Sequence, residues 1–114
     1  MTAEPRPPIR RYAKPVVVPD RLEDLAGPTT GVVDLPRHLQ WSGNPHYDLD
    51  QPGRIADLYR TVLNEAATPD DLRSYLDRAT LIRLWSTIWL PAWLRSDWES
   101  HFPELARQRP AAAA

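Results

Sequence analysis

The side chains that most often carry catalysis or bind metals are few in this chain of 114 residues, and they are widely separated. The three histidines, His38, His46 and His101, have neither the paired spacing nor the His-Glu-x-x-His pattern of a zinc site. His46 lies near Asp48 and Asp50, where it would bind a cation weakly, but this grouping is more typical of a turn histidine beside a helix cap. We therefore expect no metal site.

Motifs for nucleophilic catalysis and phosphate binding are also missing. The chain has no cysteine and no G-x-S-x-G sequence, and its four glycines are too scattered to form a phosphate-binding loop. The adjacent carboxylates Asp70 and Asp71 come at an expected helix start, where the helix dipole favours negative charge. The sequence predicts a protein that is not an enzyme and has no cofactor.

Tryptophan is the unusual residue type, with five in the chain. Trp85 and Trp89 are one helical turn apart, so in a helix they would share one face, and Trp93 would continue the row. Tryptophan beside arginine is typical of interface hot spots, whereas the alternative is a core built on large residues. The candidate interface residues are Trp41, Tyr47, Trp85, Trp89, Trp93, Arg95 and Trp98.

A second apolar stripe lies beside this row, formed by Leu81, Leu84 and Ile88. A helix that is apolar around most of its circumference needs burial on two sides, and one neighbouring helix covers only one. We therefore expect at least one of the four C-terminal tryptophans to be exposed in the monomer. Trp93 is favoured because it follows Pro91.

The spacing of apolar residues predicts that these side chains are positioned by helices. Asp50 is a good N-cap, Pro52 suits a first turn, and apolar residues then recur at helical spacing. Thr68 caps a second helix that has Pro69 at its first position, and Pro103 ends the last helix. The expected helices span about 51–66, 69–90 with a hinge near 79–80, and 91–101.

A helix-turn-helix that divides the second helix near Ala79 is disfavoured. The intervening residues contain no glycine, which such a turn usually has. The would-be recognition helix carries Arg83 as its one basic residue among apolar side chains, so it suits a core or an interface better than a DNA groove.

The rest of the chain is expected to be extended. Nine of thirteen prolines fall in residues 1–52, so residues 1–31 suggest a disordered or extended arm, and 32–49 an extended segment and turn. Residues 50–105 form the predicted helical domain and 106–114 a disordered tail. The expected fold is all-α, a bundle of about three helices behind a proline-rich arm. Neither a membrane span nor a secretory signal is recognisable, which favours the cytoplasm.

Charge is unevenly distributed along the chain. Residues 48–105 contain ten acidic and six basic residues, a net charge of −4, whereas the whole chain has −1. An acidic helical body disfavours phosphate binding and favours a basic protein surface as partner.

Four blocks of sequence carry a resemblance to a known family. They are Leu35-Pro36…Leu39…Trp41-Ser42-Gly43…Tyr47-Asp48-Leu49, Tyr59…Val62-Leu63…Glu65, Asp71-Leu72…Tyr75-Leu76-Asp77 and Leu84-Trp85…Leu90-Pro91…Arg95…Trp98. Over about residues 33–102 the chain resembles short actinobacterial helical proteins encoded next to AbiEii-type nucleotidyltransferase toxins. The resemblance implies an antitoxin-like partner of such an enzyme and brings no catalytic residues.

The expected function is a non-enzymatic protein-interaction module that binds and neutralises a nucleotidyltransferase-type toxin. One alternative is a homo-oligomeric scaffold protein, a homodimer for example, that associates through its tryptophan-rich face. Another is a nucleic-acid-binding regulator that uses the basic arm, with Arg6, Arg10, Arg11 and Lys14.

Overall fold

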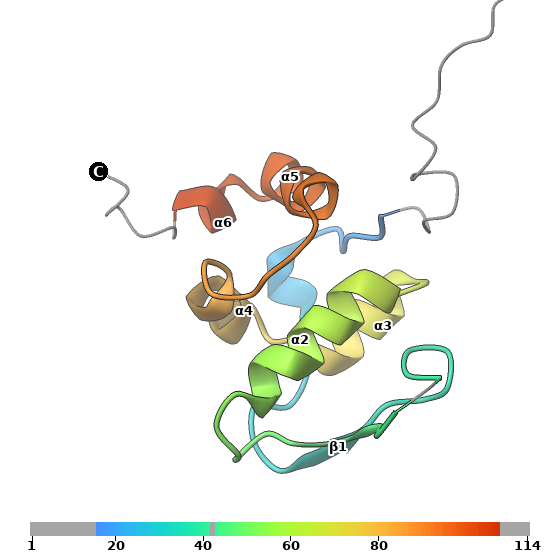
Figure 1. Ribbon diagram of the computed structural model, residues 1–114. Coiled ribbons are helices and arrows are strands. Elements are labelled where there is room, and N and C mark those ends of the chain that lie inside the picture. The colour runs from blue at the N-terminus through green and yellow to red at the C-terminus, as the bar shows by residue number, and fades with distance from the viewer. Residues whose placement is uncertain (1–15, 42, 108–114) are drawn as a thin grey trace, which may run out of the picture.

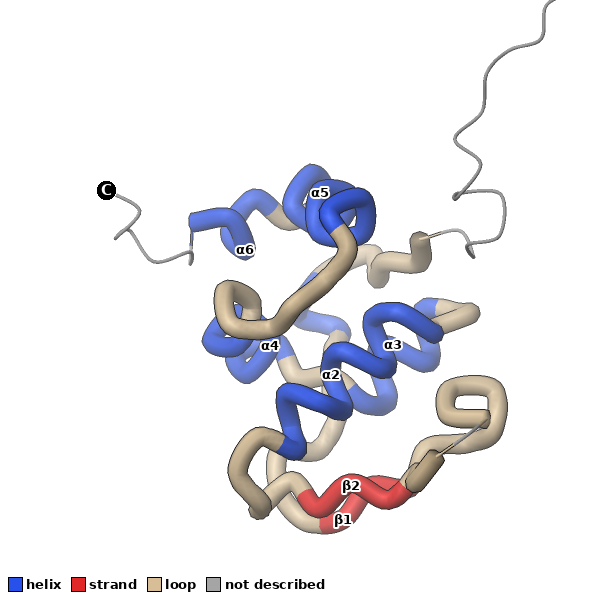
Figure 2. Tube along the Cα trace, in the orientation of Figure 1, coloured by secondary structure: helices blue, strands red, loops and turns tan. Residues whose placement is uncertain are grey.

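The computed structural model describes residues 16–41 and 43–107, and this part is mostly helical (Figures 1 and 2). Its elements are η1 (Leu22–Asp24), β1 (Val32–Asp34), β2 (His46–Asp48), α2 (Arg54–Glu65), α3 (Pro69–Tyr75), α4 (Arg78–Leu84), α5 (Ala92–His101) and α6 (Pro103–Arg107). The prediction of a helical body is confirmed, but the fold is not purely all-α. It has more and shorter helices than the three expected.

A small hairpin is the element that the all-α prediction missed. β1 and β2 pair antiparallel, with Val33 opposite Tyr47. Both of these side chains are buried and their strand neighbours point outward, so the hairpin covers the core with one face. Each strand has three residues, and an alternation this short is too brief to recognise in a sequence.

α2 begins three residues later than expected. Gly53 is its N-cap and has a φ of 79°, a left-handed conformation that glycine adopts without strain. Asp50 does not cap the helix; its Oδ1 instead accepts from the backbone N–H of Gly31 at 3.4 Å. The predicted apolar face is confirmed, because Leu58, Tyr59, Val62 and Leu63 are buried.

The expected helix over 69–90 is instead two short helices and a loop. Thr68 caps α3 in a capping box with Asp71, as the sequence indicates, but the helix ends at Tyr75. Asp77 then caps α4, and its carboxylate accepts from the N–H of Thr80 at 3.1 Å. The break therefore lies before the predicted hinge at 79–80, and it forms without a glycine.

α4 ends at Leu84, six residues before the predicted end. The carbonyl of Leu84 accepts from the Thr87 hydroxyl at 2.9 Å and also from the backbone N–H groups of Thr87 and Ile88, at 2.9 and 3.1 Å. Residues 85–91 form a loop that leads to α5, which begins one residue after its predicted start. Pro103 ends α5 as expected and also begins α6.

The hairpin and the C-terminal helices lie on opposite sides of the α2–α3 pair (Figure 1). One continuous core joins these layers, and Trp85, Trp98 and Phe102 form an aromatic group within it. Residues 16–31 also contribute, because Leu22 and Leu25 are buried against the helices. The second half of the expected arm is therefore packed rather than free.

The remainder of the expected arm and tail, residues 1–15 and 108–114, lies outside the described residues, and so does the cluster of Arg6, Arg10, Arg11 and Lys14. Within the described ranges, every helix is too short or too polar to cross a membrane.

Candidate interaction surface

The structure divides the candidate tryptophans into buried and exposed residues. Trp85 and Trp98 are fully buried, and Trp93 is half-buried. Trp89 and Trp41 are exposed, to 71% and 76% of their surface. The expectation of at least one exposed C-terminal tryptophan is confirmed, but the residue is Trp89 and not Trp93.

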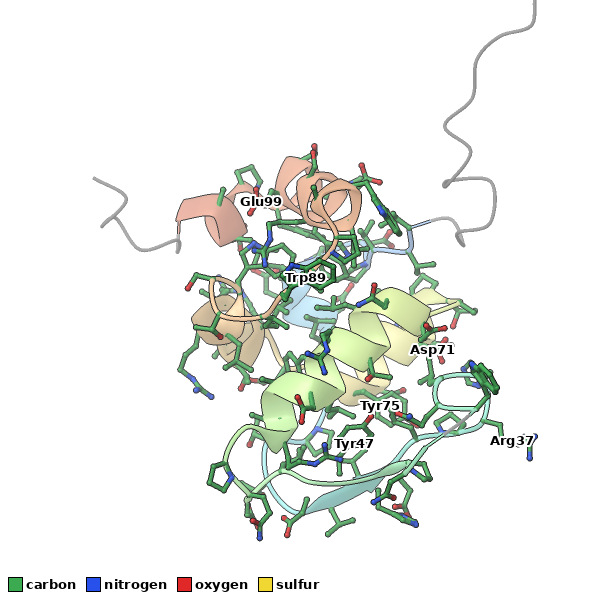
Figure 3. The ribbon with its side chains drawn as sticks, viewed as in Figure 1. Arg37, Tyr47, Asp71, Tyr75, Trp89 and Glu99 are labelled. Carbon is green, nitrogen blue, oxygen red and sulfur yellow. The ribbon has the colours of Figure 1, made fainter. Side chains whose placement is uncertain are left out.

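Trp85 and Trp89 do not share a helix face, which corrects the predicted tryptophan row. Because α4 ends at Leu84, both residues belong to the loop that follows, and a loop has no helical periodicity. Trp85 turns into the core, where its ring lies 6.1 Å from that of Trp98. Trp89 is exposed and lies on the loop that joins α4 to α5 (Figure 3).

Arg95 holds this loop in place from α5. Its Nη1 donates to the carbonyl of Trp85 at 2.9 Å and its Nη2 to that of Ile88 at 2.5 Å. The guanidinium also lies 4.9 Å from the ring centre of Trp85, in cation–π geometry. Arg95 was a predicted interface residue, but these contacts give it an internal structural role.

Glu99 completes this support one helical turn further along α5. Its Oε2 accepts from Trp85 Nε1 at 2.8 Å and lies 4.0 Å from Arg95 Nη1. Ile88 and Leu90, which flank Trp89, are both buried. Trp89 therefore projects from a loop that is fixed on both sides, so little loop entropy remains to be lost on binding.

Trp41 and Tyr47 both lie near Gln40 and Thr61 but differ in exposure. Tyr47 is buried, its hydroxyl donates to Gln40 Oε1, and it lies 3.3 Å from Thr61 Oγ1. Trp41 and Gln40 line a hollow of about 190 Å³ between the turn before Trp41 and α2. Tyr47 is thus a support beneath the surface, and Trp41 is the residue that a partner could touch.

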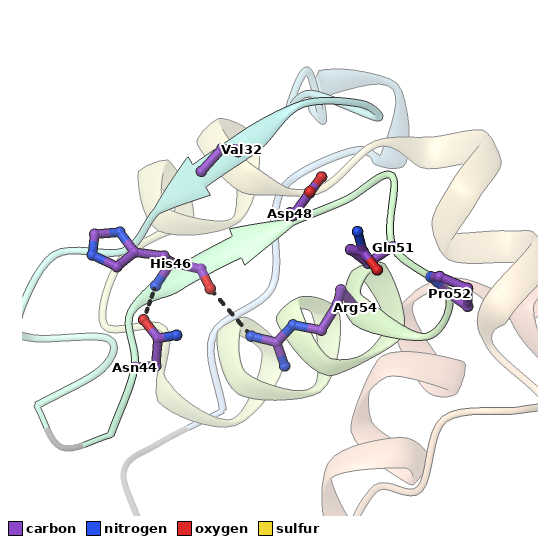
Figure 4. Close-up of a pocket in the computed structure, with 7 residues that line it drawn as sticks. All are labelled: Val32, Asn44, His46, Asp48, Gln51, Pro52 and Arg54. Carbon is purple, nitrogen blue, oxygen red and sulfur yellow. Dashed lines mark hydrogen bonds between the residues drawn. The ribbon is translucent and has the colours of Figure 1, made fainter.

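A second, wider hollow of about 640 Å³ lies beside β2 (Figure 4). Arg54 lies within it and is held on one side by the carbonyl of His46 at 3.2 Å and on the other by Asp57 at 2.9 Å. Its guanidinium stacks 4.4 Å above the centre of the Tyr47 ring. The guanidinium of Arg54 is therefore engaged in contacts within the fold.

His46 lies on β2 and contacts a carboxylate other than the two that are near it in the sequence. Its Nδ1 bonds to Asp34 on the neighbouring strand, and not to Asp48 or Asp50. No group of three metal-ligating side chains occurs among residues 16–41 and 43–107.

Asp71 and Tyr59 have shifted pKa values that reflect structure. Burial alone would raise the pKa of Asp71, but the N–H of Ala67, the His38 ring and the N–H of Thr68 together lower it. Burial raises the pKa of Tyr59 to about 12, and its hydroxyl accepts from the N–H of Asp77 at 2.8 Å. Asp71 is part of the capping box of α3, and Tyr59 bonds to the N-cap residue of α4.

No known family model matches the chain, and no curated protein or solved structure matches it.

Sequence reasoning missed the residues that surround Trp41, namely Gln40, Thr61 and Glu65. Thr61 and Glu65 are four residues apart on α2, so their shared face could have been inferred from the sequence. Their proximity to Trp41 could not, because it depends on the turn at Pro36, whose carbonyl accepts from the N–H groups of Leu39 and Gln40.

Proposed function

We propose that this chain is a non-enzymatic protein-interaction module that binds and neutralises a nucleotidyltransferase-type toxin. The observation that carries the interaction role is Trp89. It exposes 71% of its surface on a loop that Arg95 and Glu99 fix from inside. A large exposed aromatic on a pre-organised support is typical of the anchor residue of a protein interface.

The charge of the body supports a basic partner. Residues 48–105 carry a net charge of −4, and an enzyme that handles nucleotides or RNA needs a basic surface around its substrate. The acidic body would compete for that surface. The resemblance to proteins encoded beside AbiEii-type toxins supports the choice of a nucleotidyltransferase as the proposed partner.

The test is co-expression of the full chain, with an affinity tag, and the nucleotidyltransferase encoded beside it. We expect a stoichiometric complex, and we expect the chain to restore growth of cells that the enzyme alone arrests. The control is the same enzyme co-expressed with a Trp85→Ala chain, whose core is disrupted. If the enzyme neither co-purifies with the wild-type chain nor is neutralised by it, the proposal is wrong.

A further inference from the structure

The backbone groups of β1 alternate between the two edges of the strand. Two bonds to the β2 side flank the paired residues, from the N–H of Leu49 to the carbonyl of Gly31 at 2.8 Å and from that of Leu35 to the carbonyl of Pro45 at 3.0 Å. In an antiparallel pair, bonded positions alternate with positions whose polar groups point to the other edge. Val32 and Asp34 hold these positions, so their N–H and C=O groups point away from β2. Within residues 16–41 and 43–107, no group bonds to them.

The matching outer edge of β2 is capped by its neighbours. Asn44 Oδ1 accepts from the N–H of His46 at 3.0 Å, and Arg54 Nη2 donates to the carbonyl of His46 at 3.2 Å (Figure 4). The N–H of Gln51 donates to the carbonyl of Asp48 at 3.0 Å. The unpaired edge therefore belongs to β1 alone, and an unpaired edge is a template for a further strand.

The edge of β1 is also accessible. β1 lies at the rim of the molecule, with β2 between it and α2 in the view of Figure 2. Val32 is exposed to 66% of its surface, and the side chain of Asp34 is equally exposed. An exposed β-branched side chain on an unpaired edge favours the addition of a strand.

We propose that this edge pairs with β1 of a second copy of the chain, in a two-fold symmetric antiparallel dimer. Centred on Val33, the register places Val32 of each copy opposite Asp34 of the other. Every outward N–H of one strand then meets an outward carbonyl of the other, so a second copy satisfies the edge without any other sequence. The two hairpins join into one four-stranded sheet, and the two Val33 side chains meet on its buried face.

Charge and backbone conformation select this register. It separates the two Asp34 carboxylates, whereas a register centred on Asp34 would place them directly opposite each other, which is unfavourable. A register centred on Val32 would bring Gly31 into the pairing, and its φ of 84° is not extended. The net charge of the whole chain is −1, so long-range repulsion between two copies is weak.

The proposed dimer is weak, because two three-residue strands bury far less than the roughly 1,200 Å² of a stable interface. The test is a dilution series of the full ¹⁵N-labelled chain, followed by NMR and by sedimentation equilibrium. We expect a monomer–dimer equilibrium with a Kd on the order of 1 mM, in which the amides of Val32 and Asp34 shift most. A chain that stays monomeric at millimolar concentration would overturn the inference.

Two substitutions at one position separate the edge from the side chain. Asp34→Pro removes an N–H that points away from β2, so it leaves the pairing of β1 with β2 intact and should weaken the dimer about tenfold or more. Asp34→Ala keeps that N–H and removes the carboxylate, so it should change the Kd much less. Equal effects of the two variants would contradict pairing through the backbone. Loss of association in Trp89→Ala but not in Asp34→Pro would place the contact on another face.

A second measurement does not depend on how Asp34→Pro folds. The chain has no cysteine, so single cysteines report the geometry of the dimer. In the proposed register the two Val33 Cα atoms are about 4.5 Å apart, within reach of a disulfide, whereas the two Val32 Cα atoms are beyond the roughly 7 Å limit. In a glutathione redox buffer, Val33→Cys should therefore form more linked dimer than Val32→Cys, although Val33 is buried in the monomer and Val32 is exposed.

More linked dimer from Val32→Cys than from Val33→Cys would overturn the register and the inference with it. These measurements contain no partner protein, so they are independent of the proposed toxin. Self-association without toxin binding would leave the dimer standing and the proposed function wrong, and toxin binding by a strictly monomeric chain would do the reverse.

Discussion

The buried hydroxyl of Tyr59 shows how one side chain can stabilise a helix start on another element. It lies on α2 and accepts from the backbone N–H of Asp77, the N-cap of α4, at 2.8 Å. No water can replace this acceptor, because Tyr59 is fully buried. A buried N–H without an acceptor costs about 1–3 kcal/mol, so this contact helps to decide where the chain bends.

Tyr59→Phe should therefore lower the free energy of unfolding by about 1–2 kcal/mol, measured by urea denaturation. The matched control is Tyr75→Phe, because Tyr75 is half-buried and its hydroxyl has no hydrogen bond to any described residue. The neutral form of Tyr59 is favoured in the fold, since its pKa is raised to about 12. The free energy of unfolding of the wild type should consequently stay constant up to about pH 10 and fall between about pH 10 and 12. Equal stability of Tyr59→Phe and Tyr75→Phe would contradict this account.

Asp71 has the opposite pH dependence. Its lowered pKa means that the ionised carboxylate stabilises the fold, so this contribution is complete above the ordinary pKa of about 4 and is lost as the pH falls below it. Asp71→Asn should cost about 1 kcal/mol at pH 7 and flatten the acid limb of a stability–pH curve. The neighbouring Asp70→Asn should have a smaller effect on both, because Asp70 and its ion pair with Arg73 are exposed to solvent. An unchanged acid limb in Asp71→Asn would refute the role of the carboxylate.

At the scale of elements, the break between α3 and α4 is held by a distant segment. The N–H groups of Ala26 and Gly27 donate to the carbonyls of Arg73 and Leu76, at 2.9 and 2.7 Å. These carbonyls belong to the end of α3, where a helix leaves acceptors unsatisfied. Residues 26–27 thus complete the end of one helix, and Asp77 begins the next.

Gly27 is the residue that allows this close approach. A Cβ atom there would lie 2.3 Å from the backbone carbonyl carbon of Tyr75 and 2.6 Å from the nitrogen of Leu76. Gly27→Ala should therefore cost about 3 kcal/mol, at the upper end of overpacking, and lower the melting temperature accordingly.

Gly31→Ala is the control for Gly27→Ala. Gly31 has a φ of 84° but open space around it, so its replacement should cost about 1 kcal/mol from the backbone alone. A melting temperature for Gly27→Ala at or above that of Gly31→Ala would contradict the packing of residues 26–27 against α3.

Across the whole molecule, local capping and proline signals in the sequence predicted several of the helix boundaries. The Thr68–Asp71 capping box and the prolines at 69, 91 and 103 mark true helix boundaries in the described part. The split of the 69–90 segment was missed because the local cap at Asp77 is joined by tertiary causes: Tyr59, Gly27 and Arg95 bind backbone groups that local sequence would assign to a continuous helix.

The sequence predicted that a tryptophan is exposed on the candidate surface, but it did not predict which one. The exposed C-terminal tryptophan was predicted from a surplus of apolar surface, although the continuous helix assumed in that argument is absent. Which tryptophan is exposed depends on where α4 ends. Because α4 ends at Leu84, the predicted row of Trp85 and Trp89 on one helix face was wrong.

The central claim is that Trp89 anchors a partner while Trp85 holds the core. The most direct measurement is calorimetric titration of the proposed nucleotidyltransferase partner with wild-type chain and with Trp89→Ala, alongside thermal unfolding of each chain and of Trp85→Ala. We predict that Trp89→Ala keeps its melting temperature and loses about 2 kcal/mol of binding, roughly a 30-fold weaker Kd. Trp85→Ala should instead lose about 3–5 kcal/mol of stability. Unchanged affinity of Trp89→Ala, or its unfolding, would contradict the claim.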